Sequence, residues 1–275
     1  MAATRMVDLT WYELTDLVPT DPVVLVPVGT VEQHGPHLPL DTDNAIAESF
    51  AGAAAEAAPP GAALVAPCVP FGLSEHLSDF PGAIFHTTKT LIVTLTEVCT
   101  SLARSGLRRI LMINGHGSNV APIDLASREA LMREPEALFA SVSWWELGRV
   151  RDVATRLGPP SPASHACAFE TSLMLAISPE RVHMDRAVPG EEFPTSPHVW
   201  RDTLGRAPSP EHRRPIHLTE FWSSWSDNGV RGDPRGATAE LGAAMLAAGA
   251  DELAEIIDEL RKRPILGRRA ITGHP

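Results

Sequence analysis

The 275-residue chain has few residues of several reactive kinds, and each shortage excludes a class of protein. Its three cysteines, Cys68, Cys99 and Cys167, are odd in number and show no CxxC spacing, which argues against a disulfide framework and against a thiolate zinc site. Lysine occurs only at Lys89 and Lys262, so a Schiff-base mechanism has no obvious lysine. The composition therefore favours neither a disulfide scaffold nor an imine-forming enzyme.

Positive charge and long apolar runs are also scarce. The chain carries 34 acidic and 23 basic residues, and its formal net charge of -11 repels phosphate backbones, so we predict no nucleic-acid partner. Residues 1–16 contain three acidic residues and lack the apolar core of a signal peptide, and no later stretch approaches the length of a membrane span. We therefore predict a soluble, cytoplasmic protein with no membrane partner.

Short apolar runs alternate with helical segments along the chain. Strands are predicted over residues 23–28, 63–66, 109–113 and 138–142, and helices over about 44–58, 89–104, 121–133 and 238–262, with Asn44 or Asp43 capping the first helix. This order predicts an α/β fold with a mostly parallel sheet flanked by helices on both faces. We predict one domain over residues 1–275.

A proline-rich segment at about 186–235 interrupts this alternation. It shows little periodicity and contains Trp200, Trp222 and Trp225. A free linker would rarely carry three tryptophans, so the segment is predicted to be an ordered excursion or an oligomer contact.

Metal-capable side chains follow two of the predicted strands. Glu32, His34 and Asp43 come after the first strand, in "VEQHGPHLPLDTD", and His116 comes after the third, in "NGHGSN". Ligands of parallel sheets bind beyond the carboxyl ends of the strands, so these side chains should meet there. Imidazole with carboxylate suits zinc or manganese, and a carboxylate can bridge two ions that together acidify a water. The alternative is that they are solvated polar residues of loops.

Two further segments supply candidate site residues. In "SHACAFETSLMLAIS", His165 is a candidate acid or base, and Glu170 opens an apparent helix. Glu170 either binds a metal or orients a ligand, or it complements the helix dipole. His76, in "GLSEHLSDFPG", and Asp79 are candidates for the pocket wall. Cys167 is interpreted as a small core residue rather than a nucleophile.

Five ordered motifs between about Val24 and Gly242 resemble those of the creatininase (creatinine amidohydrolase) family. The motifs are "PVGTVEQHGPHLPLDTD", "FPGAIF", "INGHGSN", "HACAFETSLML" and "NGVRGDPRGATAELG". The resemblance implies a single-domain α/β fold, a dinuclear zinc or manganese site, hydrolysis of small amide-like bonds and a homohexamer.

Specific positions carry the resemblance. Glu32, His34 and His116 match metal ligands of the family, Asp43 matches its bridging carboxylate, and His165 matches the histidine proposed to shuttle protons. Trp145, in "SWWE", resembles the tryptophan that creatininase brings to its substrate.

The sequence departs from creatininase itself in the "NGH" loop. There creatininase has tyrosine and then a metal-binding glutamate, where this chain has Gly117 and Ser118. The departure argues against creatinine as the substrate and makes Glu170 the candidate to replace the missing ligand. Ser118 then becomes a candidate for substrate contact, with His76 and Trp145.

These observations predict a metal-dependent hydrolase that cleaves a C–N amide-type bond of a small substrate, cyclic substrates included, through a metal-bridging water. His165 would act as the proton carrier, with Glu170 beside the ions. Two alternatives stay open: metal-dependent hydrolysis or isomerisation of a cyclic keto polyol, and a catalytically silent metal-binding oligomer.

Overall fold

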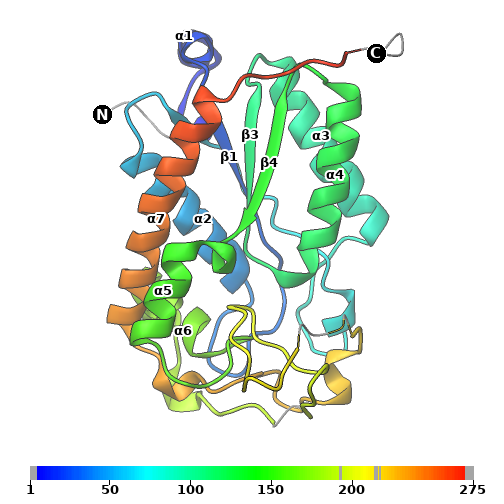
Figure 1. Cartoon of the computed structure of the whole chain (residues 1–275), viewed down its shortest axis with the longest axis vertical. Helices are drawn as coiled ribbons and strands as arrows, with labels where there is room; N and C mark the ends of the chain where they lie inside the picture. Colours follow the sequence, from blue (N-terminus) through cyan, green and yellow to red (C-terminus); the bar gives the residue numbers. More distant parts are fainter. Residues whose placement is uncertain (1–4, 192–193, 214–215, 217, 270–275) are drawn as a thin grey trace.

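The computed structural model describes residues 5–191, 194–213, 216 and 218–269 (Figure 1). Four strands form one sheet in the order β2-β1-β3-β4, namely β1 (Val23–Val28), β2 (Ala63–Val65), β3 (Arg109–Asn114) and β4 (Leu138–Ser143). Neighbouring strands are all parallel, and Val28, Asn114 and Ser143 lie in register. The loops that follow β1, β3 and β4 therefore leave the sheet at one edge.

Helices cover both faces of this sheet, which confirms the predicted fold class (Figure 1). Alternate residues of β1 face opposite layers: Val23 and Leu25 pack with α2, α5, α6 and α7, whereas Val24 and Val26 pack with α3 and α4. The helices of the described residues are α1 (Trp11–Leu17), α2 (Thr42–Ala57), α3 (Thr88–Arg104), α4 (Val120–Arg133), α5 (Gly148–Leu157), α6 (Ala168–Ile177) and α7 (Ala239–Lys262). No helix in this part of the chain is long and apolar enough to cross a membrane.

The ends of several helices follow local sequence signals. Thr87 caps α3 by accepting a hydrogen bond from the main-chain N–H of Thr90, and Gly106 follows α3 with φ of +89°. Thr238 caps α7 in the same way. The helix α1 was not predicted, although Thr10 and Glu13 form a capping box at its start.

The predicted cap of α2 was wrong. The helix begins at Thr42, with Asp41 at the N-cap position, so Asp43 and Asn44 both lie inside the first turn. The Thr42 hydroxyl donates to the main-chain oxygen of Pro39, which fixes this earlier start. The carboxylate of Asp43 is therefore not used for capping and faces the loops beyond the sheet.

The segment from 186 to 235 lies at the end of the molecule where the strands end (yellow to orange in Figure 1). Its described residues form only short 3₁₀ turns, such as Trp222–Ser224 and Pro234–Gly236, and isolated bridges. Trp200 and Trp222 are buried within the chain itself. The segment thus covers the edge of the sheet from which the loops with metal-capable residues leave.

Candidate metal centre

Two chain segments meet at Asp43. The β3 loop approaches the start of α2 so closely that a Cβ atom at Gly115 would lie 2.3 Å from the main-chain oxygen of Asp43. The N–H of Gly115 donates to the main-chain oxygen of Val28 at 2.8 Å, which ties this loop to the end of β1. A glycine is needed at this position because any side chain would separate His116 from Asp43.

The predicted ligands form one buried cluster. Asp43 lies 3.0 Å through Oδ1 from Nε2 of His34, and 3.0 Å through Oδ2 from Nδ1 of His116. Glu32 lies 3.4 Å from the same nitrogen of His116. Three overlapping groups have ligand atoms within 4.8 Å of one another: Glu32 with His34 and His165, Glu32 with Asp43 and His116, and His34 with Asp43 and Glu170.

The donor set fits divalent cations. Both carboxylate oxygens of Glu32 and Oδ2 of Asp43 are buried and accept no hydrogen bond from the described residues. A buried carboxylate oxygen without a partner is costly unless a cation satisfies it. Nitrogen and oxygen ligands in this mixture suit zinc or manganese, and the overlap of the three groups suits two ions.

Burial and the charges of neighbouring side chains shift the pKa values of the residues in the cluster. Burial raises the pKa of Glu32 to about 8. Burial alone would lower the pKa of both His34 and His116, but the neighbouring carboxylates outweigh it and raise the pKa to about 10 for His34 and about 9 for His116. Burial alone would raise the pKa of Asp43, but His34 and His116 lower it. Asp43 is thus the anion around which the cluster is arranged.

His165 presents one ring nitrogen to the cluster. Its Nε2 lies 2.7 Å from the main-chain oxygen of Gln33 and donates to it, so Nδ1 faces Glu32 at 3.6 Å. Burial and the charge of His34 hold the pKa of His165 well below its ordinary value. A neutral imidazole with a free Nδ1 lone pair can accept a proton or bind a metal.

Glu170 reaches the cluster from the first turn of α6. Its Oε2 accepts a hydrogen bond of 2.6 Å from the N–H of Ala166, a residue with φ of +51°. Burial raises the pKa of Glu170 to about 7, with His34 opposing the shift. The side chain therefore stabilises the strained turn at Ala166 and also lies within reach of His34 and Asp43.

A cavity of about 310 Å³ opens onto this cluster. Two of the predicted site residues, His34 and Asp79, are absent from its walls, and His34 is fully buried. Trp145, Ser118 and His76 all line the cavity, and Ser118 Oγ lies 3.4 Å from Nε2 of His76. Asp79, by contrast, is exposed and accepts a hydrogen bond from Ser223.

Three residues at the site were not predicted to act there. Gln33 accepts from His165 through its main-chain oxygen and donates through Nε2 to the main-chain oxygen of Gly229. Trp222 packs its ring 4.8 Å from that of His165, and Arg201 lines the cavity. Gln33 could have been noticed because it lies between two predicted ligands. The segment around Arg201 and Trp222 has no periodic pattern that reveals its neighbours.

The sequence profile of the creatininase family, described as creatinine amidohydrolase, matches residues 7–257. The chain belongs to the creatininase family.

Relatives within the family carry different names. The mycofactocin precursor peptide peptidase of Mycolicibacterium smegmatis is 36% identical over 229 residues, which are 82% of this chain and 80% of the relative. The creatinine amidohydrolase of Pseudomonas putida is 33% identical over 213 residues, which are 69% of this chain and 81% of the relative. Members of this family that resemble the chain are thus named for different substrates, a precursor peptide in one case and creatinine in the other.

Solved creatininase structures share the fold. A mutant creatininase of the Zn–Zn type has a TM-score of 0.78 and 26% identity, and covers 96% of this chain and 100% of its own. A manganese creatininase has a TM-score of 0.77 and 27% identity, and the match covers 95% of this chain and 100% of the creatininase chain. The buried histidine and carboxylate groups of this chain are consistent with a binuclear site like that of the zinc and manganese creatininases.

Proposed function

We propose that this creatininase-family hydrolase cleaves a C–N amide-type bond, with two divalent ions held by Glu32, His34, Asp43, His116 and Glu170. The observation that carries the proposal is the set of buried oxygens on Glu32 and Asp43 that accept no hydrogen bond from the described residues and lie beside histidine nitrogens at the wall of a cavity. Asp43 faces a histidine through each of its oxygens, as a bridging carboxylate would. When bound, the ions would acidify a water and polarise the carbonyl of the amide.

His165 supplies the proton transfer in this proposal. Because Nε2 is fixed by the main-chain oxygen of Gln33, Nδ1 is the nitrogen that faces the reacting groups. A neutral Nδ1 accepts the proton of the attacking water, and the resulting imidazolium returns it to the leaving nitrogen. Cleavage of an amide needs this second transfer because an unprotonated amine is a poor leaving group.

The cavity is larger than a single small ring requires. A second cavity of about 820 Å³ adjoins the metal-site cavity, and Ser118, His76, Arg201 and Trp222 line both. Gly117 and Ser118 are small where creatininase itself carries tyrosine and glutamate, which leaves the passage between the cavities open. We infer that the substrate is an extended amide, such as a short peptide, rather than creatinine.

The test is a screen for amine release by the purified, metal-loaded protein. The panel contains N-acetylated short peptides, formamides, creatinine and other cyclic amides, with cyclic keto polyols as a separate arm followed by mass spectrometry. Release of amine, lost in a His165→Gln variant that keeps its metal, supports the proposal. Turnover of keto polyols alone would replace it with the ketone chemistry, and metal binding without turnover would favour the silent metal-binding oligomer. Light scattering of the same sample tests the homohexamer predicted from the resemblance.

A further inference from the structure

His37 joins the loop that follows β1 to α6. This loop also carries Glu32 and His34, and the first turn of α6 carries Glu170, so the two segments supply three of the proposed metal ligands. His37 and Thr171, the residue after Glu170, are both fully buried. Nε2 of His37 lies 2.9 Å from Oγ1 of Thr171. A hydrogen bond between side chains therefore connects the two segments beside the candidate metal centre.

The ring of His37 is the donor in this hydrogen bond. Burial, to which the charge of His34 adds, lowers the pKa of His37 to about 4, so at neutral pH the ring is uncharged and carries a single N–H. Its Nδ1 is buried and has no hydrogen-bond partner among the described residues. A buried N–H without an acceptor is rarer in proteins than an acceptor without a donor, which places the proton on Nε2. His37 therefore donates to Thr171 and leaves only a lone pair unsatisfied.

The main chain of His37 makes a second contact beyond the far end of α6. Its oxygen accepts a hydrogen bond of 2.9 Å from the N–H of His183. In the part of the chain that the structure describes, no side-chain hydrogen bond other than that of His37 with Thr171 joins residues 29–41 to α6. A change of the His37 side chain would thus break the link to the first turn of α6 and leave the contact after its last turn.

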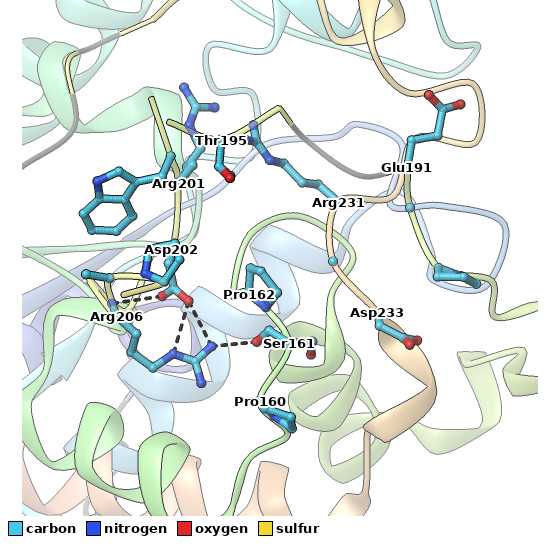
Figure 2. A pocket seen from close by; sticks show the side chains of 16 residues that line it. Pro160, Ser161, Pro162, Glu191, Thr195, Arg201, Asp202, Arg206, Arg231 and Asp233 are labelled. Atoms are coloured by element: carbon cyan, nitrogen blue, oxygen red, sulfur yellow. Dashed lines mark hydrogen bonds and ion pairs between the residues drawn. The ribbon is translucent and has the colours of Figure 1, made fainter. Parts of the chain in front are cut away.

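The chain that leads into α6 is held from a different side. Asp202 forms an ion pair with Arg206 at 3.0 Å, and Arg206 donates to the main-chain oxygen of Ser161 at 2.8 Å (Figure 2). Both charged residues belong to the segment from 186 to 235. Among the described residues, neither forms a hydrogen bond with the loop that follows β1. The position of α6 relative to that loop is therefore set by the His37 ring and not by this ion pair.

Two of the candidate metal groups depend on α6 to different extents. One consists of His34, Asp43 and Glu170, and so combines the loop after β1, α2 and α6. Another consists of Glu32, Asp43 and His116, and contains no residue of α6. A shift of α6 relative to the loop would change the distance from Glu170 to His34 in the first group. The same shift would leave the second group intact.

We propose that His37 and Thr171 are positioning residues, whose hydrogen bond fixes Glu170 relative to His34 and thereby sets the affinity of the ion that these two ligands share. The assignment of the ligands rests on the proposed function. Groups that orient metal ligands commonly change metal affinity by roughly 10- to 100-fold when they are removed. The effect is confined to one of the two ions, because the other is held without α6.

The first experiment measures the affinity of each ion without turnover. Zinc is shared between the metal-free protein and a fluorescent chelator, and the competition gives two dissociation constants. The unaltered chain is compared with Thr171→Val, which keeps the shape of the side chain, and with Ser172→Ala as the matched control. Ser172 is the next residue of α6 and is equally buried, but its hydroxyl donates to the main-chain oxygen of Ala168 and accepts from the N–H of Thr238. The control thus loses hydrogen bonds of the same helix, none of which reaches the loop after β1.

In Thr171→Val we expect one dissociation constant to rise by about 10- to 100-fold and the other to stay within about threefold. Ser172→Ala should keep both constants even where it unfolds at a lower temperature. Thr171→Ser retains a hydroxyl and should restore the affinity. Unchanged constants in Thr171→Val, or an equal loss in Ser172→Ala, overturn the proposal.

A cycle of variants tests whether the two residues act through their hydrogen bond. His37→Leu removes the donor, whereas His37→Gln can place an amide N–H near the position of Nε2. We expect His37→Leu to weaken the same ion as Thr171→Val, and the double variant to weaken it no further than either change alone. His37→Gln should keep most of the affinity. Losses that add in the double variant would show that the residues act separately, which rejects the hydrogen bond as the cause.

Turnover separates this inference from the proposed function. The same proteins are assayed for amine release over a range of zinc concentrations, and the activity of Thr171→Val should recover as the second ion is restored. Two ions bound without cleavage of any amide would reject the amide hydrolase and keep the positioning role. Cleavage of an amide with metal affinities that ignore Thr171 would do the reverse.

Discussion

The metal centre and the segment from 186 to 235 lie against each other but are built differently. The candidate metal centre is built at the ends of regular elements: Glu32 lies in the loop that follows β1, and Asp43 and Glu170 lie in the first turns of α2 and α6. The covering segment has only short turns among its described residues and contributes Arg201 and Trp222 to the cavity. The residues for the chemistry that the family shares thus come from the ends of strands and helices. The irregular segment from 186 to 235 can differ between relatives and so determine which substrate reaches those residues.

The largest expected effect is on the regular side. Asp43→Asn keeps the size of the side chain but removes the negative charge that faces both His34 and His116. We expect metal affinity to fall by more than roughly 100-fold, the upper range for groups that only orient ligands, and activity to be lost with it. Elemental analysis and the amine-release assay measure the two.

Asp41→Asn is the matched control, because Asp41 lies two positions earlier and its ion pair with Arg181 is half-exposed. It should keep both metal and activity. Retention of both in Asp43→Asn would reject the bridging role.

A smaller effect is expected at Glu170. The change tests whether Glu170 supplies the metal-binding carboxylate that is missing at Ser118. Glu170→Gln can still accept the hydrogen bond from Ala166, so the turn should persist. We expect metal content to fall from two ions to one per chain and activity to fall by roughly 100-fold. Two ions in the variant would show that Glu170 does not replace the carboxylate missing at Ser118. A Ser118→Glu change made on top of Glu170→Gln should restore the second ion.

Much of the buried histidine and carboxylate cluster could be predicted because short-range signals determine where its residues lie. The apolar runs at Val23–Val28 and Arg109–Asn114 identify strands, and parallel strands bring the residues after them to one edge. His34 and Glu32 are two positions apart, so one loop delivers both. The helix α2 began earlier than predicted because the turn at Pro39 and Thr42 satisfies its first groups without Asp43.

The contacts of Gln33 and the part of the cavity wall formed by Arg201 and Trp222 could not be predicted, because they join distant parts of the chain. Gln33 and Gly229 are 196 residues apart and meet through one hydrogen bond. Trp222 packs against His165 across an irregular loop that has no periodic pattern. Such contacts depend on the final packing, whereas periodicity reports only which face of an element is buried.

The covering segment should affect catalysis without affecting the metal. Trp222→Leu removes the ring that lies 4.8 Å from His165 and 6.2 Å from His76. We expect kcat/KM to fall by about tenfold while two ions remain bound, since aromatic contacts of this kind contribute about 1 kcal/mol beyond their area. Trp222→Phe keeps an aromatic ring and loses only the hydrogen bond from Nε1 to the main-chain oxygen of Gly229, to which Gln33 also donates. Its kcat/KM should therefore stay within about threefold of that of the unaltered chain. Loss of metal in Trp222→Leu would show that the two regions are not separable.

The smallest effect is expected at Cys167, which adjoins the metal centre but belongs to the core. Burial raises the pKa of its thiol to about 12 from the ordinary value of 9.0, and Glu170 adds to the shift. The folded protein then holds the thiol protonated at pH 8, whereas unfolding exposes a group that ionises near its ordinary value, so any contribution of the shift to stability falls as pH rises above 9. We expect iodoacetamide to modify Cys167 at least about 100-fold more slowly in the folded protein than in urea. Cys167→Ala should keep two ions and full turnover, and loss of turnover with the metal retained would assign the thiol a chemical role beside His165.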